Sequence, residues 1–171
     1  MSVDELGISG LNLIGEGSSF QDKLFDMLAE AQLFSHLEGH EIRQLAEYVH
    51  AYAVDVGVNI FPEGVQGNCM GLLVSGRIEV LKKNSTGEVQ RIAIITAGKT
   101  FGEMSLIDGL PYSATIRALE PCTVILLTRN NFTQCVQRHP ALGVKLLTEI
   151  ARLISLRLRQ TSGQLVDALG E

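Results

Sequence analysis

The sequence predicts an α+β protein, mainly β, in which an antiparallel sandwich or barrel is flanked by helical segments. Residues 51–128 contain short runs of alternating apolar residues separated by Gly or Pro-Gly turns. This spacing is typical of antiparallel strands. The segments on either side repeat apolar residues at helical spacing instead. A chain of 171 residues is long enough to form one core of this kind.

The first fifty residues divide into two parts. Residues 1–19 are rich in Gly and Ser without a clear period, and we expect a flexible arm. Residues 20–50 carry apolar residues three and four apart, which predicts a helical segment. Within it, Ser35 and Glu38 have the spacing of a capping box, so a second helix is expected to start at Ser35.

The central segment predicts the strands one after another, and Asn84-Ser-Thr-Gly87 is expected to be a polar hairpin tip between two of them. The alternating apolar residues that mark the strands are Val54, Val56, Val58 and Ile60, then Leu72 and Val74, Ile78 and Val80, Ile92 and Ile94, Ile116 and Ala118, and Val124 and Leu126.

Helical spacing returns over residues 129–171. Asn130 or Asn131 can cap a short helix that Pro140 interrupts, and a long helix is expected from Ala141 to about Leu169. This helix has two apolar stripes, which predicts two packing surfaces. The first, expected to cover the β-domain, is Leu146, Ile150 and Leu153. The second, expected to form a homodimer, is Leu147, Ile154, Leu158 and Leu165.

Composition excludes several classes of function. The net charge of −5 argues against binding DNA. No apolar run approaches the length of a membrane span, and the N-terminus lacks the regions of a signal peptide. Three widely spaced cysteines indicate reduced thiols in a cytoplasmic protein. No helix-turn-helix pattern follows the long helix, so we expect a stand-alone domain.

The candidate site is the segment FGEMSLIDGLPYSAT, residues 101–115. It begins where a strand gives way to a helical turn, and the unpaired N–H groups of such a turn suit an anion. Gly102 allows a ligand to approach the backbone, and Glu103 can accept hydrogen bonds from ribose hydroxyls. Thr100 and Glu103 also fit a capping box, in which Glu103 would bond only the Thr100 N–H. The pattern alone leaves both interpretations open.

Several motifs carry a resemblance to a known family. Phe101-Gly-Glu-Met-Ser-Leu-Ile107, followed by Pro111-x-Ser-Ala-Thr-Ile-x-Ala118, resembles the phosphate-binding cassette of cyclic nucleotide-binding domains. These domains occur in catabolite activator protein and FNR-like regulators, protein kinase A regulatory subunits and gated channels. Ile60-Phe-Pro-Glu-Gly64 and the segment 72–80 resemble the family's early turn and hairpin strand. The resemblance implies an eight-stranded antiparallel β jelly roll with a long C-terminal helix over the pocket.

The resemblance also implies a set of ligand-binding residues: Phe101, Gly102, Glu103, Met104, Ser105, Tyr112, Ser113 and Ala114. Glu103 matches the family's glutamate, which takes the ribose 2′-hydroxyl, while Ser113 and Ala114 match the residues that touch the cyclic phosphate. The family's phosphate-binding arginine does not match, because that position is Tyr112. A hydrogen bond to a charged group contributes about 1.5–3 kcal/mol, so cyclic AMP or cyclic GMP should bind at least about tenfold more weakly. Arg117 is not an obvious substitute, since its reach depends on the bulge at Pro111.

Three functional hypotheses follow from this match. The first is a regulatory or sensor domain that binds a cyclic mononucleotide or related ligand and passes the signal through the C-terminal helix. The second is a sensor of cyclic di-GMP or another non-standard ligand. The third is a ligand-free interaction or scaffold module with a degenerate pocket and a separate protein partner. No catalytic constellation is visible, and His36 and His40, four residues apart, lack an obvious third metal ligand.

Overall fold

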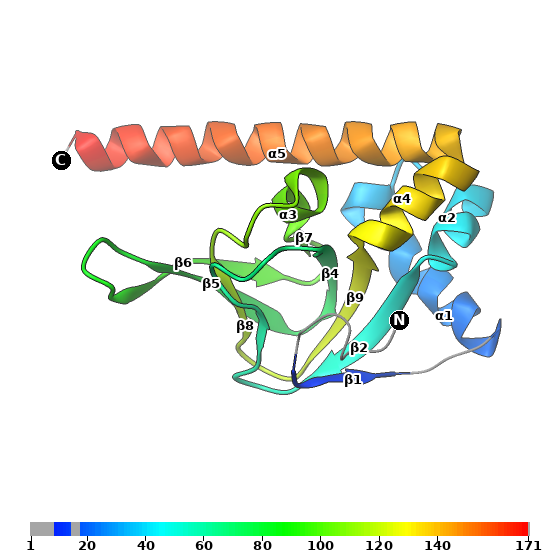
Figure 1. Ribbon diagram of the computed structural model, residues 1–171, viewed down its shortest axis with the longest axis horizontal. Coiled ribbons are helices and arrows are strands. Elements are labelled where there is room, and N and C mark those ends of the chain that lie inside the picture. Colours follow the sequence, from blue (N-terminus) through cyan, green and yellow to red (C-terminus); the bar gives the residue numbers. More distant parts are fainter. Residues whose placement is uncertain (1–8, 15–17, 171) are drawn as a thin grey trace.

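Two antiparallel sheets pack face to face in the computed structural model, which describes residues 9–14 and 18–170 (Figure 1). The five-stranded sheet runs in the order β1 (Leu11–Leu13), β2 (Val49–Val54), β9 (Cys122–Thr128), β4 (Cys69–Ser75) and β7 (Thr100–Phe101). The four-stranded sheet runs β3 (Asn59–Phe61), β8 (Thr115–Ala118), β5 (Arg77–Lys83) and β6 (Val89–Thr96). The predicted mainly antiparallel α+β fold is therefore confirmed.

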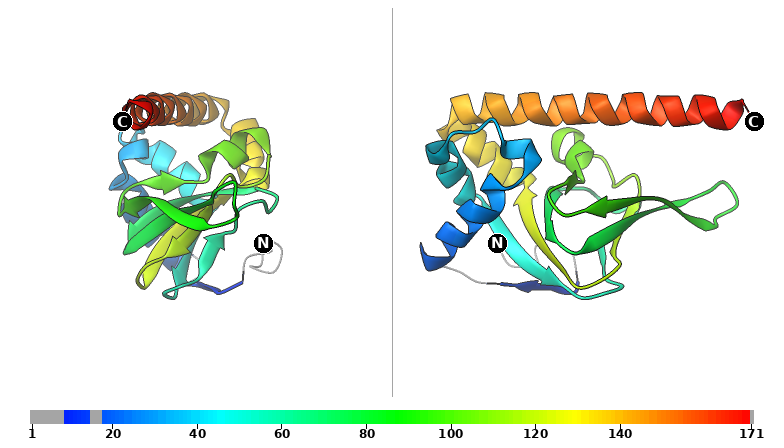
Figure 2. Two further views of the ribbon diagram at one scale, coloured as in Figure 1. Left: turned by 90° about the vertical axis from the view of Figure 1, so that its left-hand side faces the viewer. Right: turned by 180° about the vertical axis from the view of Figure 1, so that it is seen from behind.

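Helices gather at one end of the sheets and along one side (Figures 1 and 2). They are α1 (Ser18–Ala29), the short 3-10 helix η2 (Gln32–Phe34), α2 (Gly39–Ala46), α3 (Glu103–Asp108), α4 (Arg129–Arg138) and α5 (Pro140–Leu169). Two apolar clusters result. One joins the N- and C-terminal helices to the outer side of the five-stranded sheet. The other lies between the sheets and includes Phe61, Phe101 and Tyr112.

Two local predictions are corrected by the structure. Ser35 does not start a helix, because its hydroxyl donates to the carbonyl of Gln32 (2.9 Å) in η2. The second helix begins at Gly39, where the Glu41 carboxylate accepts from the Glu38 N–H (2.9 Å). The cap of α4 is Thr128 rather than either asparagine, since its hydroxyl accepts from the N–H of Asn131 (3.1 Å).

The expected N-terminal arm is also only partly testable. Residues 1–8 and 15–17 lie outside the described part of the chain. Leu11–Leu13 is not a loose segment but forms β1, which pairs with β2. The polar hairpin tip at residues 84–87 is confirmed, because the Asn84 side chain accepts from the N–H groups of Thr86 and Glu88.

Helix α5 has the two faces that its sequence predicts. Leu146 and Ile150 are buried and Leu153 is half-buried against the body of the protein. On the second stripe, Leu158 and Leu165 are exposed, as is Leu147, whereas Ile154 packs partly against the core. The C-terminal half of the helix runs past α3 in the direction in which the β5–β6 hairpin projects (Figures 1 and 2). None of the described helices is long and apolar enough to cross a membrane.

An ion pair between Glu41 and Lys145 connects α2 to α5. Lys145 Nζ donates to the buried Glu41 carboxylate at 2.8 Å, and this bond holds the pKa of Glu41 below its ordinary value of 4.5. A carboxyl with a lowered folded-state pKa stabilises the fold above its unfolded pKa, and this contribution is lost as pH falls through the folded-state pKa. Lys145→Met should therefore lower the free energy of unfolding by about 0.5–1 kcal/mol at neutral pH. In urea titrations the difference from wild type should shrink as the pH falls below the ordinary pKa of 4.5 and through the lowered folded-state pKa. A difference independent of pH would contradict this role.

Candidate functional site

The candidate site begins at the turn between β7 and α3. Gly102 has a φ of +75° and caps α3. A Cβ atom at this position would lie 2.6 Å from the Phe61 ring and 3.1 Å from the carbonyl oxygen of Cys69. The left-handed backbone and the lack of space both require glycine here. This turn places Glu103 and the first N–H groups of α3 beside the interior of the β-domain.

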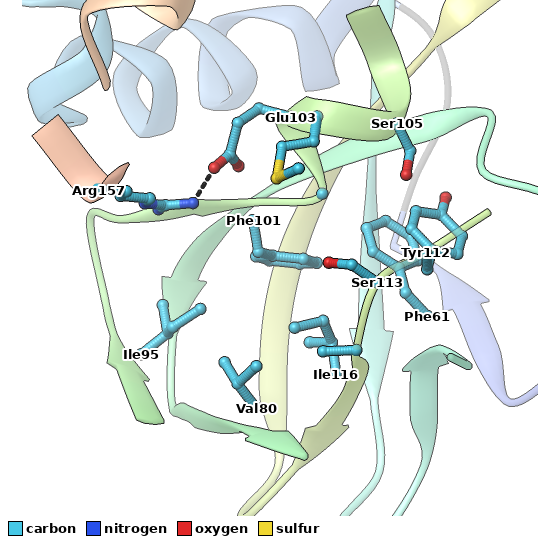
Figure 3. A pocket seen from close by; sticks show the side chains of 13 residues that line it. Phe61, Val80, Ile95, Phe101, Glu103, Ser105, Tyr112, Ser113, Ile116 and Arg157 are labelled. Atoms are coloured by element: carbon cyan, nitrogen blue, oxygen red, sulfur yellow. Dashed lines mark hydrogen bonds and ion pairs between the residues drawn. The ribbon is translucent and has the colours of Figure 1, made fainter. Parts of the chain in front are cut away.

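All eight residues implied by the resemblance line one cavity, whose volume is about 130 Å³ (Figure 3). The cavity has an apolar floor between the two sheets, and its remaining lining residues are Phe61, Val80, Ile95, Ile116 and Arg157. Its polar groups come from the α3 turn, from the segment around Ser113 and from α5. The structure therefore brings the predicted residues together and adds a residue from the C-terminal helix.

Glu103 is paired with Arg157 of α5. The Glu103 side chain is almost fully buried, and its Oε1 accepts from a terminal nitrogen of Arg157. The other terminal nitrogen donates to the carbonyl of Thr100 at 2.6 Å. Oε2 of Glu103 is buried without a hydrogen-bond partner among the described residues. The capping-box interpretation of Thr100 and Glu103 is therefore wrong, because the carboxylate bonds a helix 54 residues later in the chain.

Partial burial of Arg157 has an electrostatic consequence. Desolvation lowers the pKa of its guanidinium, but arginine stays charged at physiological pH. The ion pair therefore offsets part of the desolvation of both groups. It also connects α5 directly to the residue of the site that is best placed to accept a ligand hydroxyl.

Tyr112 belongs to the wall of the cavity and does not present its hydroxyl to a ligand. Its ring stacks on Phe61, with centroids 4.3 Å apart and planes inclined by 4°. The hydroxyl donates to the carbonyl of Cys69 and accepts from the Cys69 N–H, each at 3.2 Å. Burial raises the pKa of the Tyr112 phenol and raises the pKa of the Cys69 thiol to about 12. Figure 3 shows the hydroxyl pointing away from Ser113 and Glu103.

Two further cations, Arg117 and Lys82, are engaged elsewhere. Arg117 pairs with Glu79 (2.6 Å) and lines a separate cavity on the other side of β8. Lys82 pairs with Glu63 at 2.6 Å and donates to the carbonyl of Ser113 without lining the site. Among the residues that the structure describes, Arg157 is thus the only cation lining this cavity.

The sequence analysis did not assign Arg157 to the site, although its position on the long helix could have indicated this. Arg157 follows Leu153 by four residues and so continues the stripe formed by Leu146, Ile150 and Leu153. The apolar side of the cavity was missed as well, and its residues belong to strands that the alternating pattern had already marked. Asp108 behaves as a turn residue, since its carboxylate accepts from the Leu110 N–H at 2.9 Å.

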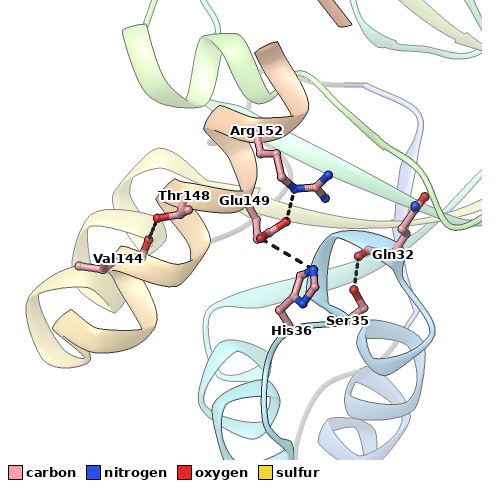
Figure 4. A network of polar contacts seen from close by, with 7 residues as sticks. All are labelled: Gln32, Ser35, His36, Val144, Thr148, Glu149 and Arg152. Carbon is pink, nitrogen blue, oxygen red and sulfur yellow. Dashed lines mark hydrogen bonds and ion pairs between the residues drawn. The ribbon is translucent and has the colours of Figure 1, made fainter. Parts of the chain in front are cut away.

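The two histidines considered as metal ligands lie apart from the cavity. His36 Nε2 is 4.0 Å from Glu149, as Figure 4 shows, and His40 Nδ1 is 3.3 Å from Glu38. No group of three or more metal-ligating side chains occurs in residues 9–14 and 18–170. These contacts give His36 and His40 ordinary surface roles.

Comparison with known proteins places the fold and the site in context. The family model described as "Cyclic nucleotide-binding domain" matches residues 54–139. A crystal structure of a cyclic nucleotide-binding domain from Methylobacillus flagellatus superposes with a TM-score of 0.81 at 28% identity. That match covers 93% of this chain and 89% of the other.

Curated regulators are similar over most of this chain. A CRP-like cAMP-activated global transcriptional regulator of Mycobacterium tuberculosis is 24% identical over 84% of this chain. The cyclic AMP receptor protein of Thermus thermophilus is 29% identical over 78%. The alignments span 62% and 60% of those two regulators, so this chain corresponds to a part of each.

Proposed function

Because this chain belongs to the cyclic nucleotide-binding domain family, we propose that it is a regulatory domain whose cavity binds a cyclic nucleotide-type ligand. The observation that carries this proposal is Glu103. Its Oε2 is buried and has no hydrogen-bond partner among the described residues, and Glu103 lines the cavity. Such an acceptor is costly to leave unpaired, and a ligand hydroxyl would satisfy it.

The rest of the cavity fits the other parts of a nucleotide. The N–H groups at the start of α3 and the exposed Ser113 hydroxyl can donate to a phosphate. Val80, Ile95 and Ile116 offer an apolar surface for a base. Since Tyr112 is held by Phe61 and Cys69, no arginine neutralises the phosphate at that position, and we expect weaker binding than in a site that has one. A cyclic dinucleotide remains the alternative ligand of the same chemistry.

The signal is proposed to leave through α5. The cavity of about 130 Å³ is smaller than the ~300–1,000 Å³ of typical small-molecule sites, so a nucleotide requires the cavity to open. Arg157 is the contact between α5 and Glu103. A ligand that engages Glu103 therefore changes the position of α5 at equilibrium.

Calorimetric titration with cyclic AMP, cyclic GMP and cyclic di-GMP tests this function. We expect saturable heat with at least one of them. Ala114→Phe should abolish it, because a phenyl ring fills the cavity that Ala114 lines. Ala97→Phe, the same change at an exposed turn residue outside this cavity, should leave the affinity unchanged. No heat at millimolar concentration with any of the three would overturn the proposal.

The buried position of Tyr112 favours a second candidate, a ligand-free interaction module with a degenerate pocket. A thermal-shift screen separates the two, because a ligand at 100 times its dissociation constant adds about 2.7 kcal/mol of stability. A flat screen, together with a protein partner that binds α5, would support the interaction module. Neither candidate assigns a catalytic role to the chain.

We further propose that the second stripe of α5 forms a homodimer in the cytoplasm. Leu147, Leu158 and Leu165 are 39%, 66% and 58% exposed, which is unfavourable for a helix in water. The three cysteines are free and buried, which fits a reducing compartment. Light scattering should show a dimer at micromolar concentration, and Leu158→Glu with Leu165→Glu should convert it to a monomer. A wild-type monomer at high micromolar concentration would contradict the homodimer.

A further inference from the structure

A second cavity shares Arg157 with the first. Its volume is about 300 Å³, and it lies between α5, η2 and the turn that joins β6 to β7. Three cations line it: Lys99 from the turn, and Arg152 and Arg157 from α5. The amides of Gln32 and Gln160 add further donors, and no carboxylate is among its described lining residues.

The hydrogen bonds leave donors free in this cavity. Arg152 contacts Glu149 through Nε (2.9 Å), and the rest of its guanidinium points away from Glu149 in Figure 4. Lys99 is exposed and forms no ion pair with the residues that the structure describes. A guanidinium has five N–H donors and an ammonium has three, so both side chains retain capacity for a ligand.

The side chains that line this cavity include cations and no described anion, whereas the whole chain has a net charge of −5. Glu149 and Glu103 balance Arg152 and Arg157, while Lys99 remains unbalanced. Cations that converge on a concave surface raise the local concentration of anions. Leu33, Leu153 and Leu156 supply an apolar wall beside them.

We propose that this cavity, the α5 groove, is a second binding site that takes a small phosphate-bearing molecule. Arginine and lysine are the side chains that bind phosphate most effectively, arginine through paired N–H donors. The volume falls within the range of small-molecule sites, and the apolar wall can hold the non-phosphate part of the ligand. The α5 groove shares only Arg157 with the cassette cavity among their described lining residues, and its binding of phosphate does not depend on the function proposed for that cavity.

Arg157 couples the two cavities, because it lines both and pairs with Glu103. A phosphate in the α5 groove competes with Glu103 for the guanidinium. The Glu103 carboxylate then becomes more available to a ligand hydroxyl in the cassette cavity. By linkage, a ligand that engages Glu103 in turn raises the affinity of the α5 groove for phosphate.

Titration with inorganic pyrophosphate at constant ionic strength, followed by NMR, tests the site. Saturable shifts are expected at the amides of Gly98 and Lys99 and at the guanidinium of Arg157. Lys99→Gln and Arg152→Gln replace exposed side chains and should each weaken binding at least about tenfold. Arg159→Gln is the matched control, since Arg159 is exposed on α5 and lines neither cavity.

The result that overturns the proposal is equally specific. Shifts that do not saturate, or an affinity that falls as much with Arg159→Gln as with Arg152→Gln, would indicate diffuse attraction to α5. Lys99 and Arg152 line the α5 groove and not the cassette cavity, so the loss of binding in their variants separates the two sites. Thermal unfolding of each variant verifies that the fold is intact.

Discussion

Replacing Tyr112 by alanine is expected to lower the free energy of unfolding by about 3–5 kcal/mol. The side chain is 6% exposed and stacks on Phe61. Alanine leaves a cavity beside that ring and removes a partner from the buried N–H and carbonyl groups of Cys69. Tyr112→Phe retains the stack and loses only the hydrogen bonds, so it should cost about 1–3 kcal/mol.

Urea unfolding followed by circular dichroism measures both changes. Val89→Ala, on a strand where the side chain is 57% exposed, is the control and should remain within about 0.5 kcal/mol of the wild type. If Tyr112→Ala behaves like this control, Tyr112 is not the wall residue described above.

Tyr112→Arg tests whether a ligand phosphate lies beside position 112. The guanidinium would replace a buried phenol without an acidic partner nearby, so the variant should be less stable than the wild type. A cyclic phosphate could supply that partner. Cyclic AMP should therefore raise the melting temperature of Tyr112→Arg by more than that of the wild type, and an equal rise would argue against a phosphate beside this position.

The second large effect is expected at Arg157. Arg157→Met removes the cation from the buried Glu103 carboxylate, and the free energy of unfolding should fall by about 1–2 kcal/mol. The expected loss of stability is small because the Arg157 side chain is 37% exposed and solvent partly screens its charge. Glu103→Gln should be destabilising as well, since it leaves the guanidinium without its anion.

A double-mutant cycle separates the ion pair from other effects. When Glu103 is already glutamine, Arg157→Met should cost less than it does in the wild type, and the difference should be at least about 0.5 kcal/mol. Arg159→Met on the same helix, which has no contact with Glu103 among the described bonds, should be additive. Additivity of Arg157→Met and Glu103→Gln would show that α5 is not coupled to the site through this pair.

Much of the site was predictable because it is local in sequence. Glu103 is the first residue of the short helix α3, and Ser113 and Ala114 follow this helix after one turn of the chain. All three residues and Gly102 line one cavity. The alternation of apolar residues likewise predicted most strands, since period two directly reflects the two faces of a sheet.

The features that were not predictable depend on distant partners. The direction of Tyr112 is set by Cys69, 43 residues earlier, and by Phe61, so sequence alone suggested a ligand contact. Glu103 took part in a local capping pattern, but Arg157 on α5 provides its actual partner. Ser35 and Glu38 matched a capping box in spacing, yet the residues before them close a 3-10 turn that moves the helix start to Gly39.

The most direct test of the central claim compares cyclic AMP with 2′-deoxy cyclic AMP in NMR titrations of the wild-type protein. The two ligands differ only in the 2′-hydroxyl, which is proposed to donate a hydrogen bond to Glu103 Oε2. We predict that both shift the amides of residues 102–105 and 113–114, and that the deoxy ligand binds about 10- to 100-fold more weakly. Equal affinities, or no binding of cyclic AMP, would contradict the assignment of Glu103 as the residue that receives the ligand.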